Sequence, residues 1–147
     1  MGTPMGRVLL IEDDDLVRDA ADTALSLAGY TVVAAGDGAA GLAALAPPGP
    51  FGGRPPDLIL LDLLMPGLDG ASFLDAYRRT PGAHAPVVVF TAVRDAAEQA
   101  MAIAADGVLA KPFRLEELLA TVGRYVRRAD GGCGAEADPD ASPAPSA

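Results

Sequence analysis

Five polar side chains stand directly after short apolar runs of this sequence: Glu12, Asp13, Asp62, Thr91 and Lys111. Three carboxylates brought to one place would repel one another unless a cation lay between them. Hard oxygen ligands suit Mg²⁺, which readily shares its coordination shell with a phosphate. Asp62 is then positioned as a nucleophile toward phosphorus, giving an acyl phosphate. Thr91 offers a hydroxyl donor, and Lys111 a positive charge, to the phosphoryl oxygens.

These side chains can act together only if the apolar runs are parallel strands of one sheet. The pattern predicts strands at residues 8–11, 31–35, 58–61, 87–90 and 107–110, alternating with helices at residues 16–28, 39–46, 71–79, 95–105 and 114–128. This alternation favours right-handed crossovers and a parallel sheet covered on both faces. The carboxyl ends of all five strands then meet at one edge, where ligands bind in open α/β sheets.

The helix ends and faces can also be predicted. Asp14 or Asp15 is suited to cap the first helix, and Gly29 to end it. The apolar positions of this helix are Leu16, Ala20, Ala24, Leu27 and Ala28. The last helix is predicted to have an apolar face made of Leu115, Leu118, Leu119, Val122 and Val126. Residues 47–56 hold five prolines and three glycines, which predicts a long, mobile surface loop.

The composition fits one domain with an appended tail. At 147 residues there is room for one core, which we assign to residues 7–128. Residues 129–147 are acidic and rich in proline and alanine, so we expect them to be disordered. No apolar run approaches the roughly 20 residues of a membrane span. We expect a cytoplasmic protein that does not span a membrane, and the net charge of −9 argues against direct nucleic-acid binding.

Four motifs, in order along the chain, resemble the receiver domain of bacterial two-component response regulators. They are Val8-Leu9-Leu10-Ile11-Glu12-Asp13-Asp14, Asp62-Leu63-Leu64-Met65-Pro66-Gly67-Leu68-Asp69-Gly70, Thr91-Ala92 and Lys111-Pro112-Phe113. The resemblance implies a flavodoxin-like, doubly wound sheet of five parallel strands in the order 2-1-3-4-5, with five helices. It also implies that a histidine kinase supplies a phosphoryl group to Asp62 in a two-component phosphorelay.

The same resemblance implies a role for each site residue. Asp62 is the phosphoacceptor, and the Mg²⁺ ligands are Asp13, Asp62 itself and the backbone carbonyl of Leu64, with Glu12 holding the metal through water. Thr91 is the switch hydroxyl. Lys111 binds the phosphate, and the family has a cis peptide bond at the place of Lys111-Pro112.

The expected partners are a sensor histidine kinase or phosphotransfer protein and a downstream protein target. The regulator is expected to be a monomer or a phosphorylation-dependent dimer. Because little chain follows residue 128, we expect a stand-alone regulator without a DNA-binding output domain. It would be a signalling protein rather than an enzyme, apart from catalysing its own phosphorylation and slow dephosphorylation.

One position departs from the family pattern. Three residues before the lysine, the family usually has an aromatic side chain that moves inward with the switch hydroxyl, and this chain has Val108. A valine cannot fill that volume. We therefore expect a change at this position to affect partner affinity more than phosphorylation.

Parts of this sequence also fit other classes of protein. Residues 36–41 match the dinucleotide pattern G-x-G-x-x-G, but they open the second strand–helix unit, which favours a turn and helix cap. A haloacid-dehalogenase-type phosphatase needs an aspartate two residues after its nucleophile, where this chain has Leu64. Without that base, a phosphoaspartate is expected to hydrolyse slowly. A phosphorylation-independent adaptor of the same fold remains open, and His84 is expected to be a surface residue.

Overall fold

A computed structural model describes residues 6–47, 49–51, 54–63, 70–92 and 104–126. Strands and helices alternate as predicted: β1 (Arg7–Ile11), α1 (Asp15–Leu27), β2 (Thr31–Ala35), α2 (Gly38–Leu45), β3 (Leu58–Asp62), α3 (Gly70–Arg78), β4 (Val87–Ala92), β5 (Gly107–Lys111) and α5 (Leu115–Tyr125). The helix predicted at residues 95–105 lies outside the described residues except for Ala104 and Ala105, which are not helical. None of the helices described is both long and apolar enough to cross a bilayer.

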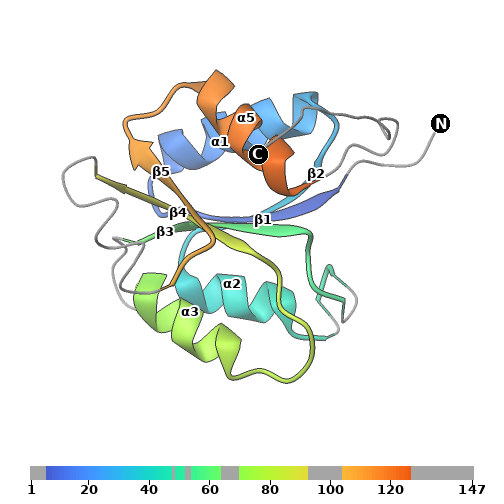
Figure 1. Ribbon diagram of the computed structural model, residues 1–147. Helices are drawn as coiled ribbons and strands as arrows, with labels where there is room; N and C mark the ends of the chain where they lie inside the picture. The colour runs from blue at the N-terminus through green and yellow to red at the C-terminus, as the bar shows by residue number, and fades with distance from the viewer. Residues whose placement is uncertain (1–5, 48, 52–53, 64–69, 93–103, 127–147) are drawn as a thin grey trace.

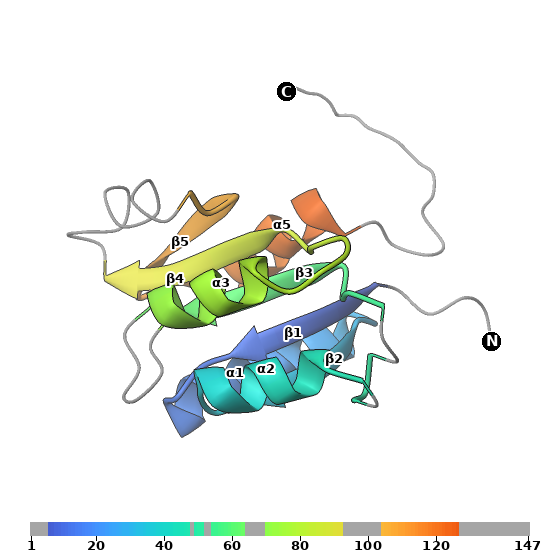
Figure 2. The same cartoon turned by 90° about the horizontal axis from the view of Figure 1, so that it is seen from below.

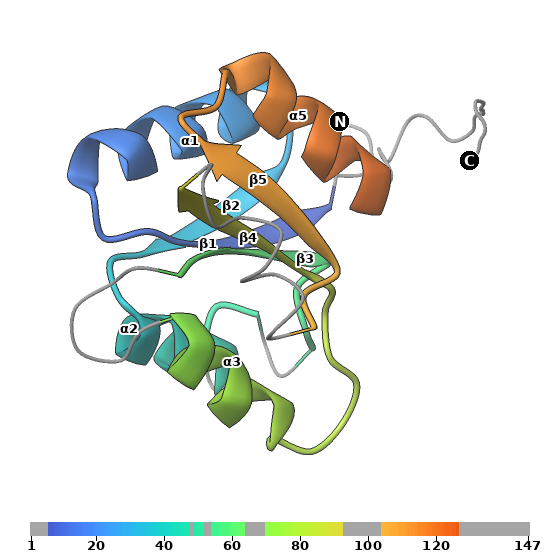
Figure 3. The same ribbon diagram turned by 60° about the vertical axis from the view of Figure 1, so that its left-hand side comes forward.

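The five strands form one parallel sheet in the order β2-β1-β3-β4-β5, as the resemblance implied. Helices α1 and α5 cover one face of the sheet, and α2 and α3 cover the other (Figures 1 and 3). All five residues of the central strand β3 are buried. A strand covered on both faces has to be apolar throughout, which explains the run of four aliphatic residues that precedes Asp62.

The sheet separates two hydrophobic clusters. Alternate side chains of each strand point to opposite faces. On the α1 and α5 side, the cluster includes Leu10, Leu25, Leu60, Phe90 and Leu118. On the α2 and α3 side, it includes Leu9, Ile11, Leu61, Phe73 and Val89. The two clusters hold the strands in register, and with them the strand ends that carry the polar side chains.

Helix α1 has the predicted ends but a different buried face. Asp14 caps it, and Gly29 follows it with a φ of 105°. The buried side chains are Ala21 and Leu25, whereas Leu16 is 81% exposed and Leu27 is 83% exposed. The helix carries two apolar stripes, and spacing alone does not show which one meets the sheet. The apolar stripe that the helical spacing indicated, which contains Leu16 and Leu27, therefore lies largely on the surface.

The last helix shows the same effect at one position. Leu118, Val122 and Val126 are buried as predicted. Leu115, in the first turn of α5, is 44% exposed.

The segment rich in proline and glycine is a loop, as predicted, but part of it is packed into the protein. Phe51 within it is 4% exposed and belongs to the hydrophobic cluster on the α2 and α3 side. The Arg7 guanidinium donates hydrogen bonds to the carbonyl oxygens of Phe51 and Pro55, at 3.4 and 2.7 Å. It also lies 5.3 Å from the centre of the Phe51 ring. The described part of this loop is thus fastened to β1.

The start of β1 lies against the end of α5. A side chain at Gly6 would overlap Val126, and the Gly6 carbonyl accepts a hydrogen bond from the Thr31 amide at 3.1 Å. Gly6 directly precedes β1, so this contact lies at the amino ends of the strands. Figure 2 shows the start of β1 and the end of α5 on the same side of the molecule. Residues 6 and 126 therefore meet at the edge of the sheet opposite to Asp62.

Candidate functional site

Three strand ends bring charged side chains to the carboxyl edge of the sheet. Asp62 is the last residue of β3, Lys111 is the last of β5, and Glu12 directly follows β1. The register pairs Ile11 with Leu61, so Glu12 and Asp62 lie at the same level on neighbouring strands. The predicted meeting of these residues at one edge is confirmed.

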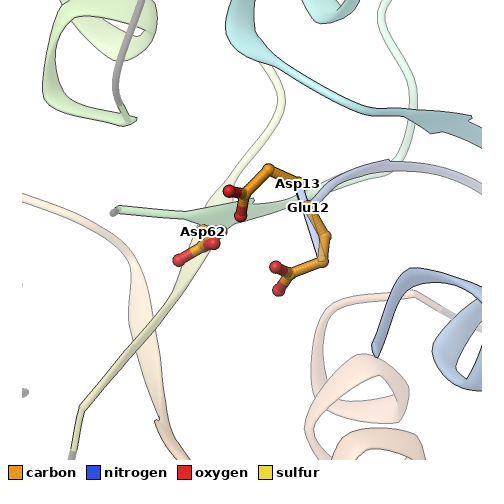
Figure 4. A group of neighbouring side chains, drawn as sticks. All are labelled: Glu12, Asp13 and Asp62. Carbon is orange, nitrogen blue, oxygen red and sulfur yellow. The ribbon is translucent and has the colours of Figure 1, made fainter. Parts of the chain in front are cut away.

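Three carboxylates come together there. Glu12, Asp13 and Asp62 each offer an oxygen atom, and these atoms lie within 4.8 Å of one another (Figure 4). Glu12 is 0% exposed and Asp62 is 3% exposed. Two unit charges at this distance repel by roughly 3 kcal/mol at an effective dielectric constant near 20. The cluster is therefore suited to a cation.

Lys111 supplies part of the positive charge. Its Nζ atom lies 2.8 Å from Oε1 of Glu12 and 3.5 Å from Oδ2 of Asp62. Burial is the largest single influence on the pKa of Lys111 and lowers it, but the two carboxylates together outweigh burial and raise the pKa above 10.5. The lysine is therefore fully protonated at neutral pH and points its charge at Asp62.

Glu12 retains capacity to serve a metal ion. Its Oε2 atom accepts a hydrogen bond from the Asp14 amide at 3.1 Å. Its buried Oε1 atom has an ion-pair contact to Lys111, but among the described residues it accepts no hydrogen bond with proper angles. A hard carboxylate oxygen with an unused lone pair, next to two further carboxylates, fits Mg²⁺ or a water in its coordination shell.

The loop between β1 and α1 is shaped by its own side chains. Asp14 accepts hydrogen bonds from the amides of Leu16 and Val17, at 2.9 and 3.2 Å, and so caps α1. Asp13 is held between this cap and the end of β1. The run of acids is thus divided between helix capping at Asp14 and the cluster at Glu12 and Asp13.

Gly70 explains how α3 can begin against the end of β3. A Cβ atom at this position would lie 2.7 Å from the carbonyl oxygen of Asp62 and 2.6 Å from Cα of Leu63. Both contacts are with backbone atoms, which cannot move aside cheaply. The glycine is required by close packing behind Asp62.

The remaining predicted site residues are only partly described. Thr91 lies in β4 and pairs with Ala110, one position beyond the pair formed by Asp62 and Phe90. Its backbone is therefore at the same edge, but its side chain is not among the described ones. Leu64 lies outside the described residues. The peptide bond at Lys111-Pro112 is cis, which confirms the prediction.

Residues 36–41, which match the dinucleotide pattern, and His84 both have structural roles. Asp37 accepts a hydrogen bond from the Ala40 amide at 2.7 Å and caps α2, as a turn-and-cap function requires. His84 is exposed, with its Nε2 atom 2.8 Å from the Thr80 carbonyl oxygen. His84 precedes β4 and so lies at the edge of the sheet opposite to Asp62.

An open cavity beside the carboxylates was not predicted from the sequence. Its volume is about 800 Å³, and it reaches from Asp62 and Lys111 to the apolar side chains Leu16, Phe113 and Leu115. The apolar wall comes from the exposed stripe of α1 and from the segment after β5. The sequence shows leucines next to charged residues, at Leu16 and Leu115, but not that these leucines are exposed.

A doubly wound parallel sheet thus carries three clustered acids and a lysine at its carboxyl edge. This chain belongs to the response regulator receiver domain family, whose sequence profile matches residues 8–123. Phosphorylation and Mg²⁺ dependence are typical of this family, and its members interact with histidine kinases or phosphotransfer proteins.

Individual relatives agree. The chain is 40% identical to the response regulator MprA of Mycobacterium ulcerans over 125 residues, which are 83% of this chain and 50% of that protein. It is 39% identical to the transcriptional regulatory protein QseB of Escherichia coli O157:H7 over 128 residues, which are 85% of this chain and 55% of that protein. This chain thus spans about half the length of these curated relatives.

Among solved structures, the chemotaxis response regulator CheY4 of Vibrio cholerae is 31% identical. It matches with a TM-score of 0.70 over 82% of this chain and 98% of that chain.

Proposed function

We propose that this receiver accepts a phosphoryl group on Asp62 from a phosphohistidine of a partner kinase or phosphotransfer protein. The observation that supports this most is the nearly buried Asp62 carboxylate, with two further carboxylates within 4.8 Å and the Lys111 ammonium 3.5 Å from its Oδ2 atom. An oxygen of Asp62 forms a bond to phosphorus while the bond from phosphorus to the imidazole nitrogen breaks. The product is an aspartyl phosphate.

The other residues act on the charge of the transferred group. Lys111 neutralises a phosphoryl oxygen, and Thr91 donates a hydrogen bond to another. Asp13, Asp62 and the Leu64 carbonyl would hold Mg²⁺ directly and Glu12 would hold it through water, where the ion stabilises charge on the phosphoryl oxygens. Because no acid stands at the place of Leu64, the aspartyl phosphate hydrolyses slowly and acts as a timed signal. The signal leaves the domain through altered contacts with another protein.

The donor is proposed to dock on the apolar strip formed by α1 and the start of α5. Leu16 and Leu27 are 81% and 83% exposed, and a groove along Ala20, Leu27 and Leu115 continues from the cavity at Asp62. A helix of the donor laid on this strip would bring its histidine to the carboxylates.

The proposal is tested by following the intact mass of the protein with Mg²⁺ and acetyl phosphate. The wild type is expected to gain one phosphoryl group that is lost slowly, and Asp62→Asn to gain none. Asp75→Asn is the matched control, because Asp75 is an exposed acid paired with Arg79 on α3. If Asp62→Asn is still modified at another residue at the wild-type rate, the assignment is wrong. If the wild type gains no mass with acetyl phosphate or with any histidine kinase, the adaptor interpretation replaces it.

The docking strip gives a separate prediction. Leu16→Ser and Leu27→Ser are expected to slow phosphorylation by a histidine kinase at least about fivefold, the change produced by losing about 1 kcal/mol of binding. Phosphorylation by acetyl phosphate, which needs no docking, should be unchanged in the same variants. Equal slowing with both donors would place the effect at Asp62 rather than at the strip.

A further inference from the structure

Arg18 on α1 extends back to the loop that carries two of the three clustered carboxylates. Its Nη1 atom donates a hydrogen bond to the carbonyl oxygen of Glu12 at 2.9 Å. Its Nη2 atom forms an ion pair with Asp15 in the first turn of α1. The side chain is 22% exposed. The planar guanidinium thus connects the end of β1 to the start of α1, using two donors at once.

The carbonyl that Arg18 holds belongs to the peptide unit between Glu12 and Asp13. Fixing the plane of this peptide fixes the positions of the Cα atoms of Glu12 and Asp13, since both atoms lie in that plane. The two side chains then keep only the rotations about the bonds to those atoms. The amide of Glu12 is held as well, because it donates to the Ala35 carbonyl of β2 at 3.1 Å. Residue 12 is therefore fastened at its amide by the neighbouring strand and at its carbonyl by Arg18.

We propose that Arg18 is a positioning residue that presets Glu12 and Asp13 for Mg²⁺. This inference rests on the proposed function, since it concerns the same metal-binding cluster. Arg18 touches neither the metal nor the phosphoryl group. It acts by keeping the carboxylates of Glu12 and Asp13 in the arrangement that binds Mg²⁺, against their mutual repulsion.

The sign of the effect distinguishes positioning from simple electrostatics. A positive charge near the cluster repels a cation, so if Arg18 acted through its charge alone, removing it would strengthen Mg²⁺ binding. Replacing arginine by lysine keeps the charge and loses the two-pronged geometry. Positioning predicts weaker Mg²⁺ binding in both cases.

The test is a calorimetric titration of the full chain with MgCl₂, comparing wild type, Arg18→Lys and Arg18→Gln. We expect the Kd for Mg²⁺ to rise about three- to tenfold in both variants, somewhat less than the roughly 10- to 100-fold seen when a direct partner of a metal ligand is removed. The Mg²⁺ concentration for half-maximal phosphorylation by acetyl phosphate should rise by the same factor, with the rate at saturating Mg²⁺ retained.

Arg79→Gln is the matched control, because Arg79 also pairs with an acid four residues before it, at 2.9 Å from Asp75. It directly follows α3, whose far end lies away from the carboxylates. Its Kd for Mg²⁺ should equal that of the wild type. Urea unfolding without Mg²⁺ verifies that each variant is folded at the titration temperature. If Arg18→Lys is not folded, the Kd of Arg18→Gln alone tests the positioning role.

An unchanged Kd in Arg18→Lys, or tighter binding in Arg18→Gln, would overturn the positioning role while leaving the proposed function intact. Failure of the wild type itself to bind Mg²⁺ and to become phosphorylated would instead overturn the proposed function, and this inference with it.

Discussion

Lys111 lies where two buried carboxylates need a counter-charge. Its ammonium contacts both Glu12 and Asp62, whose side chains are 1% and 4% exposed. The lysine therefore stabilises the folded protein when no metal is bound. In the proposed Mg²⁺-dependent reaction it would, in addition, bind the phosphoryl group.

Replacing Lys111 is expected to lower the stability of the folded protein even when no phosphorylation takes place. Lys111→Met should lower the free energy of unfolding by about 3 kcal/mol without Mg²⁺ at neutral pH, since it leaves two buried carboxylates facing each other. Urea denaturation measures this. Added Mg²⁺ should recover more stability in the variant than in the wild type.

The matched control for Lys111 is Arg79→Met, which removes a cation from an exposed pair and should cost less than about 1 kcal/mol. An equal cost in both variants would mean that Glu12 and Asp62 do not depend on the lysine charge in the folded protein.

At the scale of elements, β5 forms one edge of the sheet and presents Val108, which is 39% exposed, where the family usually has an aromatic residue. Val108→Tyr is expected to change the affinity for a downstream partner severalfold while leaving the rate of phosphorylation by acetyl phosphate unchanged. Binding assays with phosphorylated protein, and mass spectrometry for the rate, separate the two. Equal changes in both quantities would contradict this separation.

The turn before β5 contains a residue in an unfavourable backbone conformation. Ala104 has a φ of 54° and is exposed, and its carbonyl accepts a hydrogen bond from Arg78 at 2.8 Å. Ala104→Gly should stabilise the protein by up to about 1 kcal/mol, because glycine adopts this conformation without a steric penalty. The thermal midpoint of unfolding measures the change.

Gly82→Ala is the opposite control for Ala104→Gly. Gly82 has a φ of 94°, and a Cβ atom there would meet no other atom within 4 Å, so alanine should destabilise through the backbone alone. Two changes of the same sign would show that backbone strain does not govern these turns.

Local patterns predicted the elements because each of them has a local cause. The caps at Asp14 and Asp37 follow from side chains that bind nearby amides. The buried face of α1 was missed because the helix has two apolar stripes and only tertiary packing chooses between them. The burial of Phe51 was not predicted, because the prolines and glycines around it indicate a loop backbone and do not indicate whether one ring within the loop is buried.

The sequence predicted which residues form the candidate site, but not the hydrogen bonds that hold them in place. Strand ends indicated Asp62, Lys111 and the acids after β1, since parallel strands share one edge. The contact of Arg18 with the Glu12 carbonyl could not be predicted from the sequence. Every residue has a backbone carbonyl, so the residue type at position 12 does not indicate that its carbonyl accepts this hydrogen bond.

For the whole molecule, titration above pH 10 should lower stability. Burial raises the pKa of Tyr77 above 10.0, despite its hydrogen bond with the Ala85 amide. Burial and then the Asp106 charge raise the pKa of Tyr125, against the smaller effect of Arg124. The pKa of Lys111 is raised as well. The folded protein therefore binds more protons than the unfolded chain above about pH 10, so the free energy of unfolding falls as pH rises.

Urea midpoints between pH 9 and pH 11.5 check this dependence. Stability from these three groups should be constant below about pH 10 and decline above it, and Tyr125→Phe should show a shallower decline from a lower starting value, because it also loses the hydrogen bond to the Asp106 carbonyl. A midpoint that is flat throughout would contradict the prediction.

The contact between Gly6 and Val126 determines how this domain can be joined to anything else. Both ends of the described chain leave from one point, on the side of the sheet away from Asp62. A fused reporter or partner domain can thus be attached at either end without obstructing the edge of the sheet that carries Asp62. It would also be separated from Asp62 by the length of a strand, roughly 17 Å for five residues. Communication between Asp62 and any such attachment must then pass through the sheet or along the helices, because direct contact with Asp62 is geometrically disfavoured.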